Sequence, residues 1–466
     1  MSPTEIAPIA RHKATAAKIR AVEDGPVNPL TGKKWSAKNR KLLDNRRKLP
    51  VYINLDKILE TYHRNSYLVL TSDTGSGKST QVPQLILQDE LASGLRVVCT
   101  QPGRILAESL ARRVSEEAGV VLGQEVGYRV GGDEAVSDKT RVEYVTEDVL
   151  LVDLMFDEAL SKYGVVIIDE AHERTMELDV LLALLKKAGG ARKNNDLQTI
   201  VMSANLNAET FQNFYKNCEA VHIPCKSFNV DVQYLESGAE TPNVLIAAAQ
   251  TVLYIHQKLP PGHILVFAPG QKEISQIIEY LRKRAGTMQI RPLYSKLAGS
   301  QQQIMLDSKG PRQCIVATNI AEASLTIDGI VYVVDTGIAK QQVYNPRLGM
   351  YDLRVESISQ ASANQRKGHA GRTQDGICFR LYTKSAFDNM PPSTQPKILT
   401  QPIDSAVLKL KASGYNEVVD IDWLTPPCPE SFSRAAQNLL DWGFLAPDNT
   451  INSKGISASV LSIEPI

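Results

Sequence analysis

The chain has 466 residues, of which 43% are apolar and 22% are charged, and its formal net charge is +1. This length allows two or three domains with buried cores, and the composition is that of an ordinary globular protein. The balanced charge excludes binding of nucleic acid through bulk charge alone, so local basic patches must be sought instead. The longest apolar runs, such as residues 164–168 and 330–334, are too short to span a bilayer, and no membrane contact is expected.

The N-terminal residues lack the apolar core of a signal peptide, which predicts an intracellular protein. The six cysteines form no CxxC pair, so we expect reduced thiols and no zinc site. Residues 1–48 are polar and rich in Lys and Arg, with Gly25, Pro26 and Pro29 interrupting any long helix. They are predicted to be a basic, flexible N-terminal arm, either solvated or in contact with nucleic acid or import factors.

From residue 49 onward, strand and helix patterns alternate. Such alternation is typical of a parallel sheet with helices on both faces, and it predicts a first α/β domain over residues 49–222. Strands are predicted at residues 67–71, 96–100, 141–146, 165–169 and 199–203, and helices at residues 81–91 and 105–118.

The same pattern resumes over residues 223–397, which predicts a second α/β domain of similar size. Its predicted strands are residues 264–268, 314–318 and 330–335, with a helix at 274–285 and a β-hairpin at about 338–357. Helical spacing at residues 403–412 and 431–442 predicts a small third domain over residues 398–466. The predicted fold class is therefore α/β, with two tandem parallel-sheet domains followed by a small helical domain.

Residues 72–79 follow the first predicted strand and match the phosphate-loop pattern GxxxxGK[ST], except that Ser72 replaces the first Gly. Glycines let backbone N–H groups approach phosphate oxygens, the Lys neutralises the β- and γ-phosphates, and the Ser hydroxyl binds Mg²⁺. The Cβ of Ser72 is expected to strain the turn and to weaken binding if the turn needs a positive φ. The predicted nucleotide-binding residues are Thr74, Gly75, Ser76, Gly77, Lys78, Ser79 and Thr80.

Asp169 and Glu170 come directly after the apolar strand at residues 165–169. An Asp at a strand end holds Mg²⁺, and an adjacent Glu can polarise the attacking water. The predicted metal-binding set is Ser79, Asp169 and Glu170. The chain is therefore expected to bind Mg²⁺ together with ATP or another nucleoside triphosphate.

Further motifs follow in a fixed order at residues 100–104 (Thr-Gln-Pro-Gly-Arg), 146–148 (Thr-Glu-Asp), 169–172 (Asp-Glu-Ala-His), 203–205 (Ser-Ala-Asn), 317–329 and 365–373. With them the chain resembles the DEAH-box RNA helicases of superfamily 2 over about residues 28–460. The hairpin and residues 28–32 resemble the pre-mRNA-splicing and ribosome-biogenesis branch. The resemblance implies that the two α/β domains are RecA-like and that the third domain is winged-helix-like.

The resemblance also implies roles for individual residues. Glu170 would act as the base, and Gln365 would orient the attacking water. The remaining implied catalytic residues are Ser203, His369 and Arg372, and the further nucleotide contacts are Arg113 and Asp328. The strand would be held by its phosphates and sugars, with little reading of the bases. The implied RNA contacts are Arg104, Thr146, Gly270, Thr318 and Asn319.

Several positions depart from the family pattern. His369 replaces the first of two arginines that reach the γ-phosphate, and Asn205 replaces a Thr that couples hydrolysis to unwinding. Gly103 replaces one of two paired arginines, residues 131–132 are Gly-Gly instead of Arg-Phe, and Ile338 replaces the Phe that stacks on adenine. The ratchet and OB-fold domains of the family, where activators dock, are expected to be absent, either by natural truncation or because the sequence is a fragment.

The favoured reading is an ATP-dependent RNA helicase or RNP-remodelling NTPase in pre-mRNA splicing or ribosome biogenesis, nuclear or otherwise cytoplasmic. Its expected partners are single-stranded RNA or RNP and protein activators. An alternative is a degenerate paralogue that binds nucleotide or RNA with little or no turnover. A DNA helicase or viral-type helicase is less favoured, because the hairpin and residues 28–32 resemble the splicing branch.

Overall fold

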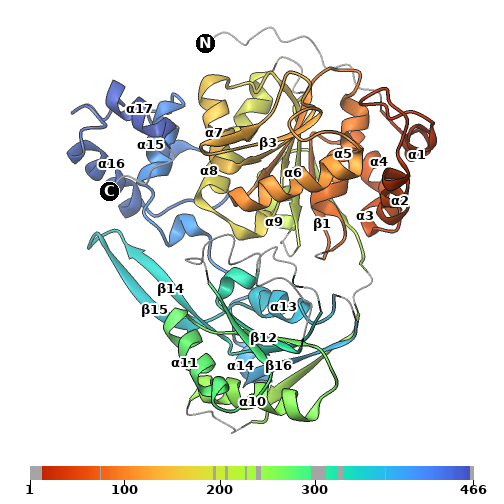
Figure 1. Cartoon of the computed structure of the whole chain (residues 1–466). Helices are drawn as coiled ribbons and strands as arrows, with labels where there is room; N and C mark the ends of the chain where they lie inside the picture. The colour runs from red at the N-terminus through yellow and green to blue at the C-terminus, as the bar shows by residue number, and fades with distance from the viewer. Residues whose placement is uncertain are drawn as a thin grey trace. The chain divides into compact units, whose positions relative to one another are not determined.

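The computed structural model describes residues 13–73, 75–192, 196–204, 208–225, 228–237, 243–294, 311–322, 327, 329–372 and 374–461. The chain divides into two units (Figure 1). The first lobe comprises Met1–Cys225, Tyr344–Met350 and Pro396–Ile466. The second lobe comprises Lys226–Val343 and Tyr351–Gln395. Among the described residues, no helix is both long and apolar enough to cross a membrane.

The first lobe is built on an eight-stranded sheet with the order β4-β3-β5-β2-β6-β7-β1-β8. Its paired strands are parallel except for β3 and β4. Every residue of the central strand β6 is buried, as expected for a parallel strand with helices on both faces. The strands are β1 (Tyr67–Thr71), β2 (Arg96–Gln101), β3 (Val126–Val130), β4 (Asp133–Ala135), β5 (Val142–Thr146), β6 (Tyr163–Ile168), β7 (Gln198–Ser203) and β8 (Cys218–His222).

Helices cover both faces of this sheet. Val69 of β1 packs in one apolar cluster with α7 and α8, whereas its neighbours Leu68 and Leu70 pack in another with α4, α5 and α6. This alternation follows from the period of two along a strand. The helices of this part are α1 (Ala16–Asp24), α2 (Ala37–Arg46), α3 (Pro50–Ile53), α4 (Leu55–Arg64), α5 (Lys78–Glu90), α6 (Arg104–Ala118), α7 (Glu147–Phe156), the 3₁₀ helix η1 (Ala171–Glu173), α8 (Met176–Ala191) and α9 (Ala208–Phe214).

The N-terminal segment differs from the flexible arm predicted for residues 1–48. From Lys13 to Lys48 it is described, and it contains α1 and α2, with Ile19 and Leu43 buried. Arg46 is 6% exposed and lies within 4 Å of the Glu23 and Glu117 carboxylates. The sequence suggested an arm because its basic residues looked like a solvated run, but acidic side chains distant in the sequence pair with them.

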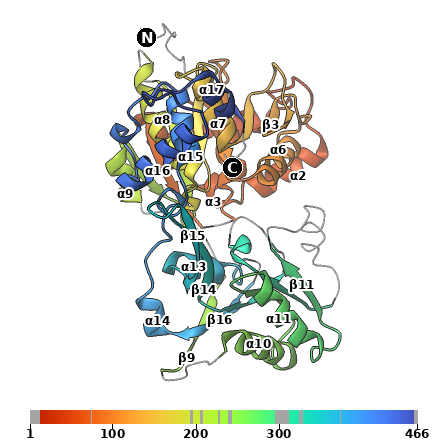
Figure 2. The same cartoon turned by 90° about the vertical axis from the view of Figure 1, so that its left-hand side faces the viewer.

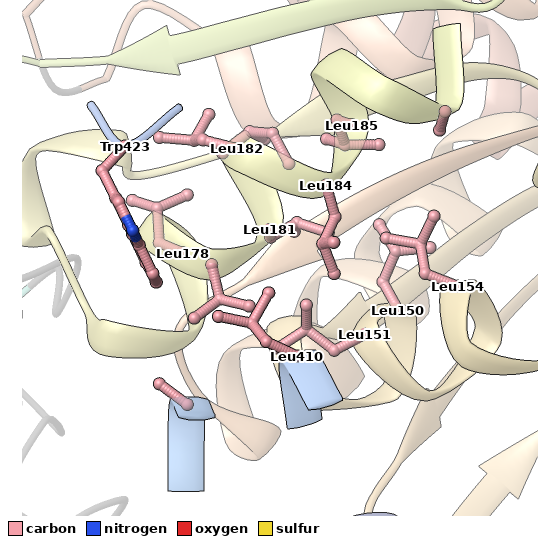
Figure 3. Packing of buried hydrophobic residues seen from close by; sticks show 14 of the residues in the cluster. Leu150, Leu151, Leu154, Leu178, Leu181, Leu182, Leu184, Leu185, Leu410 and Trp423 are labelled. Atoms are coloured by element: carbon pink, nitrogen blue, oxygen red, sulfur yellow. The ribbon is translucent and has the colours of Figure 1, made fainter. Parts of the chain in front are cut away.

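The C-terminal residues pack onto the first lobe. Figure 3 shows leucines of α7 and α8 in one buried cluster with Leu410 of α15 and with Trp423. An ion pair between Lys409 and Asp148 joins α15 to α7 beside this cluster. The elements here are η3 (Lys397–Leu399), α15 (Asp404–Ala412), η4 (Val418–Asp420), α16 (Pro429–Asp441) and α17 (Ser453–Val460), with one antiparallel bridge between Leu445 and Ile451.

The second lobe contains a parallel six-stranded sheet with the order β11-β12-β10-β13-β16-β9. Figure 2 shows α10 and α11 close together, and they belong to the apolar cluster on one face of the sheet. The strands are β9 (Val230–Leu235), β10 (His263–Phe267), β11 (Gln289–Leu293), β12 (Gln313–Ala317), β13 (Ile330–Asp335) and β16 (Gly376–Thr383). The helices are α10 (Val244–Lys258), α11 (Gln271–Arg282), η2 (Asn319–Ala321), α13 (Gln360–Gly368) and α14 (Lys384–Asp388).

The segment predicted as a hairpin forms the two-stranded sheet of β14 (Ile338–Asn345) and β15 (Met350–Ser357). The two mainly parallel sheets and the helices that pack on them confirm the α/β class with two tandem RecA-like domains. The domain boundaries drawn from the sequence stay predictions.

Candidate functional site

The loop between β1 and α5 has the backbone of a phosphate cradle. Gly75 and Gly77 adopt left-handed φ angles of +83° and +90°, and Gly77 is the N-cap of α5. A Cβ at Gly77 would lie 3.0 Å from the Leu49 side chain, so glycine is required there for both space and conformation. The free N–H groups at the N-terminus of a helix attract an anion, and an anion bound at this N-terminus would lie next to Lys78.

Lys78 is 6% exposed, and burial lowers the pKa of its ammonium, while the carboxylates of Asp169 and Glu170 oppose this shift. The ammonium donates hydrogen bonds to the Ser72 carbonyl (2.6 Å), the Ser72 hydroxyl (2.9 Å) and the Asp73 carbonyl (3.2 Å). Ser72 is not among the described non-glycine residues with positive φ. The strain expected from its Cβ is therefore wrong, because the turn does not need a left-handed residue there. The distinguishing feature of Ser72 is its hydroxyl.

The other predicted residues of the loop lie close by. The Ser76 hydroxyl is buried and 2.6 Å from that of Ser72. Ser79 is half-buried, and its carbonyl accepts a 2.7 Å hydrogen bond from the Tyr144 hydroxyl. The Thr80 hydroxyl donates to the Gly77 carbonyl. Thr74 lies outside the described residues.

Asp169 follows β6 and is fully buried at the same sheet edge as the phosphate loop. One of its oxygens accepts a 2.9 Å hydrogen bond from the Gln101 amide, and the other accepts from the Glu170 N–H at 2.9 Å. Gln101 is a site residue that the sequence analysis did not single out, although it lies in the motif at residues 100–104. Its contact fixes the orientation of the carboxylate.

Glu170 has a left-handed backbone with φ +52°. Its carboxylate lies 3.5 Å from His172 Nδ1, which in turn lies 3.4 Å from the Ser203 hydroxyl at the end of β7. Burial lowers the pKa of His172 to about 4, and the charge of Lys78 adds to this shift. His172 is therefore neutral near pH 7 and links two predicted catalytic residues without carrying charge.

The residues at this edge of the sheet fit a magnesium site in which substrate phosphates complete the coordination shell of the ion. The candidate ligands are the Ser79 hydroxyl and the two carboxylates of Asp169 and Glu170. Among the described residues no group of three or more His, Cys, Asp or Glu side chains is arranged to hold a metal by itself. Mg²⁺ usually takes one or two protein carboxylates and completes its shell with water and substrate phosphates, so this sparse set suits it.

Arg113 lies on α6, about one turn before Glu117, and its Nε donates to the buried Glu117 carboxylate at 2.7 Å. Glu117 also accepts hydrogen bonds from the Gln81 and Gln84 amides of α5, at 2.8 and 2.9 Å. Glu117 thus connects Arg113, a predicted nucleotide contact, to the helix that begins at the phosphate loop. Glu117 could not be singled out from the sequence, because the two glutamines that it binds lie 36 and 33 positions away.

Arg104 and Thr146 follow two neighbouring strands, since Gln101 of β2 is paired with Thr146 at the end of β5. Arg104 begins α6 and Thr146 is the N-cap of α7, so two helix N-termini meet here. A Cβ at Gly131 would lie 2.8 Å from the Arg104 guanidinium. Glycine at position 131, which differs from the family pattern, therefore leaves room for the Arg104 side chain.

The predicted RNA contacts of the second lobe have a matching position. Gly270 is the N-cap of α11 after β10, and Thr318 and Asn319 begin η2 after β12. Strands β10 and β12 are parallel neighbours, with Phe267 paired with Ala317. In each lobe, the predicted contacts therefore follow two adjacent parallel strands at their carboxyl ends, where ligands of such sheets bind.

The motif at residues 365–373 lies on and after α13 in the second lobe. Gln365 and Arg372 are half-buried, whereas His369 is 2% exposed. Burial lowers the pKa of His369 to about 3, and the charge of Arg372 adds to this shift. Its ring lies 6.0 Å from that of Phe267, so His369 is a neutral residue of the lobe interior.

Arg366, which the sequence analysis did not assign a role, organises this region. It is fully buried, and its guanidinium lies 2.7 Å from Asp335 and 2.6 Å from Glu322. Because residues of β13, η2 and α13 lie far apart in sequence, only the fold brings these charges together. Two further positions singled out from the sequence, Asp328 and Asn205, lie outside the described residues.

Comparison with known proteins agrees with this arrangement. Residues 55–214 match the DEAD/DEAH box helicase family, and residues 246–374 match the helicase conserved C-terminal domain. The structure is similar to two crystal structures of HrpB from Escherichia coli, called a DExH-box NTPase and a DEAH/RHA helicase, with TM-scores of 0.77 and sequence identities of 32% and 31%.

These similarities cover 88% of this chain and 51% and 52% of the HrpB chains. The chain therefore spans about half the length of the solved structures that it matches. The chain therefore contains a DEAD/DEAH box helicase domain followed by a helicase conserved C-terminal domain, and it is similar in sequence and fold to the HrpB structures.

Proposed function

We propose that this chain is an ATP-dependent RNA helicase or RNP-remodelling NTPase that uses Mg²⁺. The main support for nucleotide binding is the buried Lys78, which lies in a loop whose glycines have left-handed φ angles. This loop is at the same edge of the sheet as the buried Asp169. A loop of this kind binds the phosphates, and bound Mg²⁺ would neutralise charge on them. Ser79 and Asp169 would hold the ion.

Glu170 is proposed to take the proton of the attacking water. Its carboxylate is 3.5 Å from the neutral His172, which supplies a hydrogen-bonding partner without neutralising the base. Gln365 is proposed to orient the water, and Arg372 to stabilise charge on the γ-phosphate. These last two roles rest on the family resemblance.

The nucleic-acid part rests on the repeated placement of the predicted contacts. Arg104 and Thr146 in the first lobe, and Gly270, Thr318 and Asn319 in the second, follow adjacent strands at their carboxyl ends. Backbone N–H groups at helix starts, hydroxyls and one guanidinium are suited to phosphates and sugars. A role in splicing or ribosome assembly, and with it a nuclear location, rests only on the resemblance of residues 28–32 and of the hairpin.

The first test is ATP hydrolysis by the purified chain with and without single-stranded RNA. Lys78→Ala serves as the blank and is expected to lower turnover by about 10²-fold, because it removes a charge-stabilising donor. Lys57→Ala, on the exposed side of α4, is the matched control and should hydrolyse ATP as the wild type does. RNA-stimulated turnover above the blank supports a working motor, and strand displacement on a tailed RNA duplex then tests unwinding.

A second candidate function is nucleotide or RNA binding with little turnover. Two observations favour it: the Ser72 hydroxyl competes for Lys78, and His369 is a buried neutral ring instead of an arginine. Turnover equal to that of Lys78→Ala, together with retained nucleotide binding, would support this alternative and contradict the motor.

A further inference from the structure

A polar cavity of about 240 Å³ lies in the first lobe where β2 and β5 end. It is lined by Gly103, Arg104, Thr146, Glu147, Thr175 and Lys397, among others. Within the described part of the chain, neither N-cap residue, Gly103 of α6 or Thr146 of α7, gives its helix a side-chain hydrogen bond. The cavity therefore combines two open helix N-termini, a guanidinium and an ammonium, which suit a phosphate. The carboxylates of Asp148 and Glu177 also line it, and Lys409 pairs with Asp148.

The wall of this cavity also contains a carboxyl group that the proposed function leaves unexplained. Glu147 is 5% exposed, and its Oε2 accepts a hydrogen bond from the Thr175 hydroxyl. Its Oε1 is buried and has no hydrogen-bond partner among the described residues. Buried polar atoms are nearly always paired in folded proteins, so an unpaired oxygen of a residue that lines a cavity points to a ligand that supplies the partner.

A ribonucleotide supplies both a phosphate and a hydroxyl. The 2′-hydroxyl both donates and accepts hydrogen bonds, and it is the group that distinguishes RNA from DNA. We infer that Glu147 recognises the ribose 2′-hydroxyl of a strand whose phosphate lies at Arg104 and Thr146. Glu147 would thereby be a specificity-determining residue for RNA, an inference that rests on the proposed function.

The protonation of Glu147 agrees with this role. Burial raises its pKa to about 8, against the opposing effect of the Thr175 hydroxyl. A neutral acid does not repel the phosphates of the strand, whereas an ionised one at this place would. The neutral form can donate from Oε1 to the ribose oxygen, and the hydroxyl itself can donate to the carbonyl form of that oxygen. With DNA, neither hydrogen bond is available.

A purely structural role makes a different prediction. Thr175 is the N-cap of α8 and accepts a 3.1 Å hydrogen bond from the Leu178 N–H, so Glu147 also braces the start of that helix. Loss of a brace would lower stability and weaken binding of RNA and DNA alike. The ratio of the two affinities therefore separates recognition from bracing.

The experiment measures Kd by fluorescence anisotropy for single-stranded RNA and DNA of the same sequence, using the 466-residue chain. The wild type is expected to prefer RNA. Glu147→Ala should reduce the ratio Kd(DNA)/Kd(RNA) by about tenfold, as expected when one buried hydrogen bond decides specificity. Glu147→Gln, which keeps a hydrogen-bonding group, should retain most of the preference. Glu108→Gln, the same change on the exposed side of α6, is the control and should retain all of it.

A third strand, DNA with 2′-hydroxyls restored at successive single positions, should recover affinity at one position in the wild type and at none in Glu147→Ala. Thermal unfolding of each variant verifies that it is folded. If Glu147→Ala binds both strands more weakly at an unchanged ratio, the inference is wrong and Glu147 is a brace. If the wild type binds RNA and DNA equally while RNA stimulates its ATPase, the inference fails and the proposed motor stands. If it binds neither strand, the proposed function itself fails.

Discussion

The Lys78 ammonium donates a 2.9 Å hydrogen bond to the hydroxyl of Ser72, at the position where the resembling family has glycine. Both side chains are buried, and the same ammonium also donates to the Ser72 and Asp73 carbonyls. The phosphate oxygens of a nucleotide would compete for these protons. The Ser72 hydroxyl is therefore an additional competitor of the substrate within the phosphate loop.

Ser72→Ala is expected to tighten ATP binding by about 2- to 10-fold, because it removes one neutral acceptor of the kind worth about 0.5–1.5 kcal/mol. The measurement is the Kd of a fluorescent ATP analogue. Ser76→Ala is the matched comparison, since its hydroxyl lies 3.5 Å from the ammonium, and it should have a smaller effect. Weaker binding by Ser72→Ala would show instead that the hydroxyl helps to hold the loop in its binding shape.

Gly131→Ala should weaken single-stranded RNA binding at little cost in stability. The added Cβ would lie 2.8 Å from the end of the Arg104 side chain, which is flexible and exposed and can move away. Loss of one phosphate contact typically reduces the salt dependence of binding, so the slope of log Kd against log salt should fall by about 0.7. Gly132→Ala is not a matched control, since Gly132 has a φ of +86°.

Arg104→Ala gives the reference value for Gly131→Ala, because it removes the same guanidinium outright. Anisotropy titrations at several salt concentrations provide both slopes. An unchanged slope in Gly131→Ala, with a reduced slope in Arg104→Ala, would show that Arg104 keeps its contact despite the added methyl group.

The ion pair of Lys409 with Asp148 should stabilise the packing of the C-terminal helices on the first lobe. Lys409→Met keeps the apolar stem but leaves a partly buried Asp148 without its cation, which is expected to cost about 1–3 kcal/mol. Urea unfolding followed by tryptophan fluorescence is a suitable measurement, because Trp423 belongs to the buried cluster that α15 shares with α7 and α8.

A double-mutant cycle with Asp148→Asn isolates the pairwise contribution of that ion pair. Lys57→Met, on the exposed side of α4, serves as the control. If Lys409→Met and Asp148→Asn change the free energy of unfolding additively, the two side chains stabilise the fold by packing and not by their ion pair.

Glu147 should make stability depend on pH in a defined direction. Its pKa is raised from 4.5 to about 8 by burial, opposed by the Thr175 hydroxyl and the charge of Lys397 and reinforced by Glu177 and Asp148. Since the folded state keeps a proton that the unfolded chain loses, stability falls as pH rises from about 4.5 to 8. Arg104 also lines this cavity and keeps its charge throughout.

Glu147→Gln cannot lose that proton, so its melting temperature should exceed that of the wild type increasingly from pH 5 to pH 8. The two melting temperatures should differ least at pH 5, where the side chain at position 147 is neutral in the folded state of both proteins. A difference in melting temperature that stays constant over this pH range would contradict the raised pKa. Differential scanning fluorimetry in a series of buffers at constant ionic strength is sufficient.

Local sequence determined the elements whose causes are local. The strand predicted at residues 67–71 is β1, and the strand predicted at residues 330–335 is β13, because a parallel strand covered on both faces must be a short apolar run. Gly75 and Gly77 likewise have the positive φ angles that a phosphate loop needs. The two-lobe α/β fold and the nucleotide chemistry could therefore be read from residue order alone.

Contacts between distant residues were decided only by the tertiary structure. Gln101 and Asp169 are 68 positions apart in the sequence, and Glu147 and Thr175 are 28 positions apart, and no sequence pattern predicts either hydrogen bond. Arg46 looked like part of a solvated arm until the fold placed it beside Glu23 and Glu117. Burial and the charges of neighbours set the state of a polar side chain, and both depend on the folded chain, whereas a sequence motif specifies only which side chains are available.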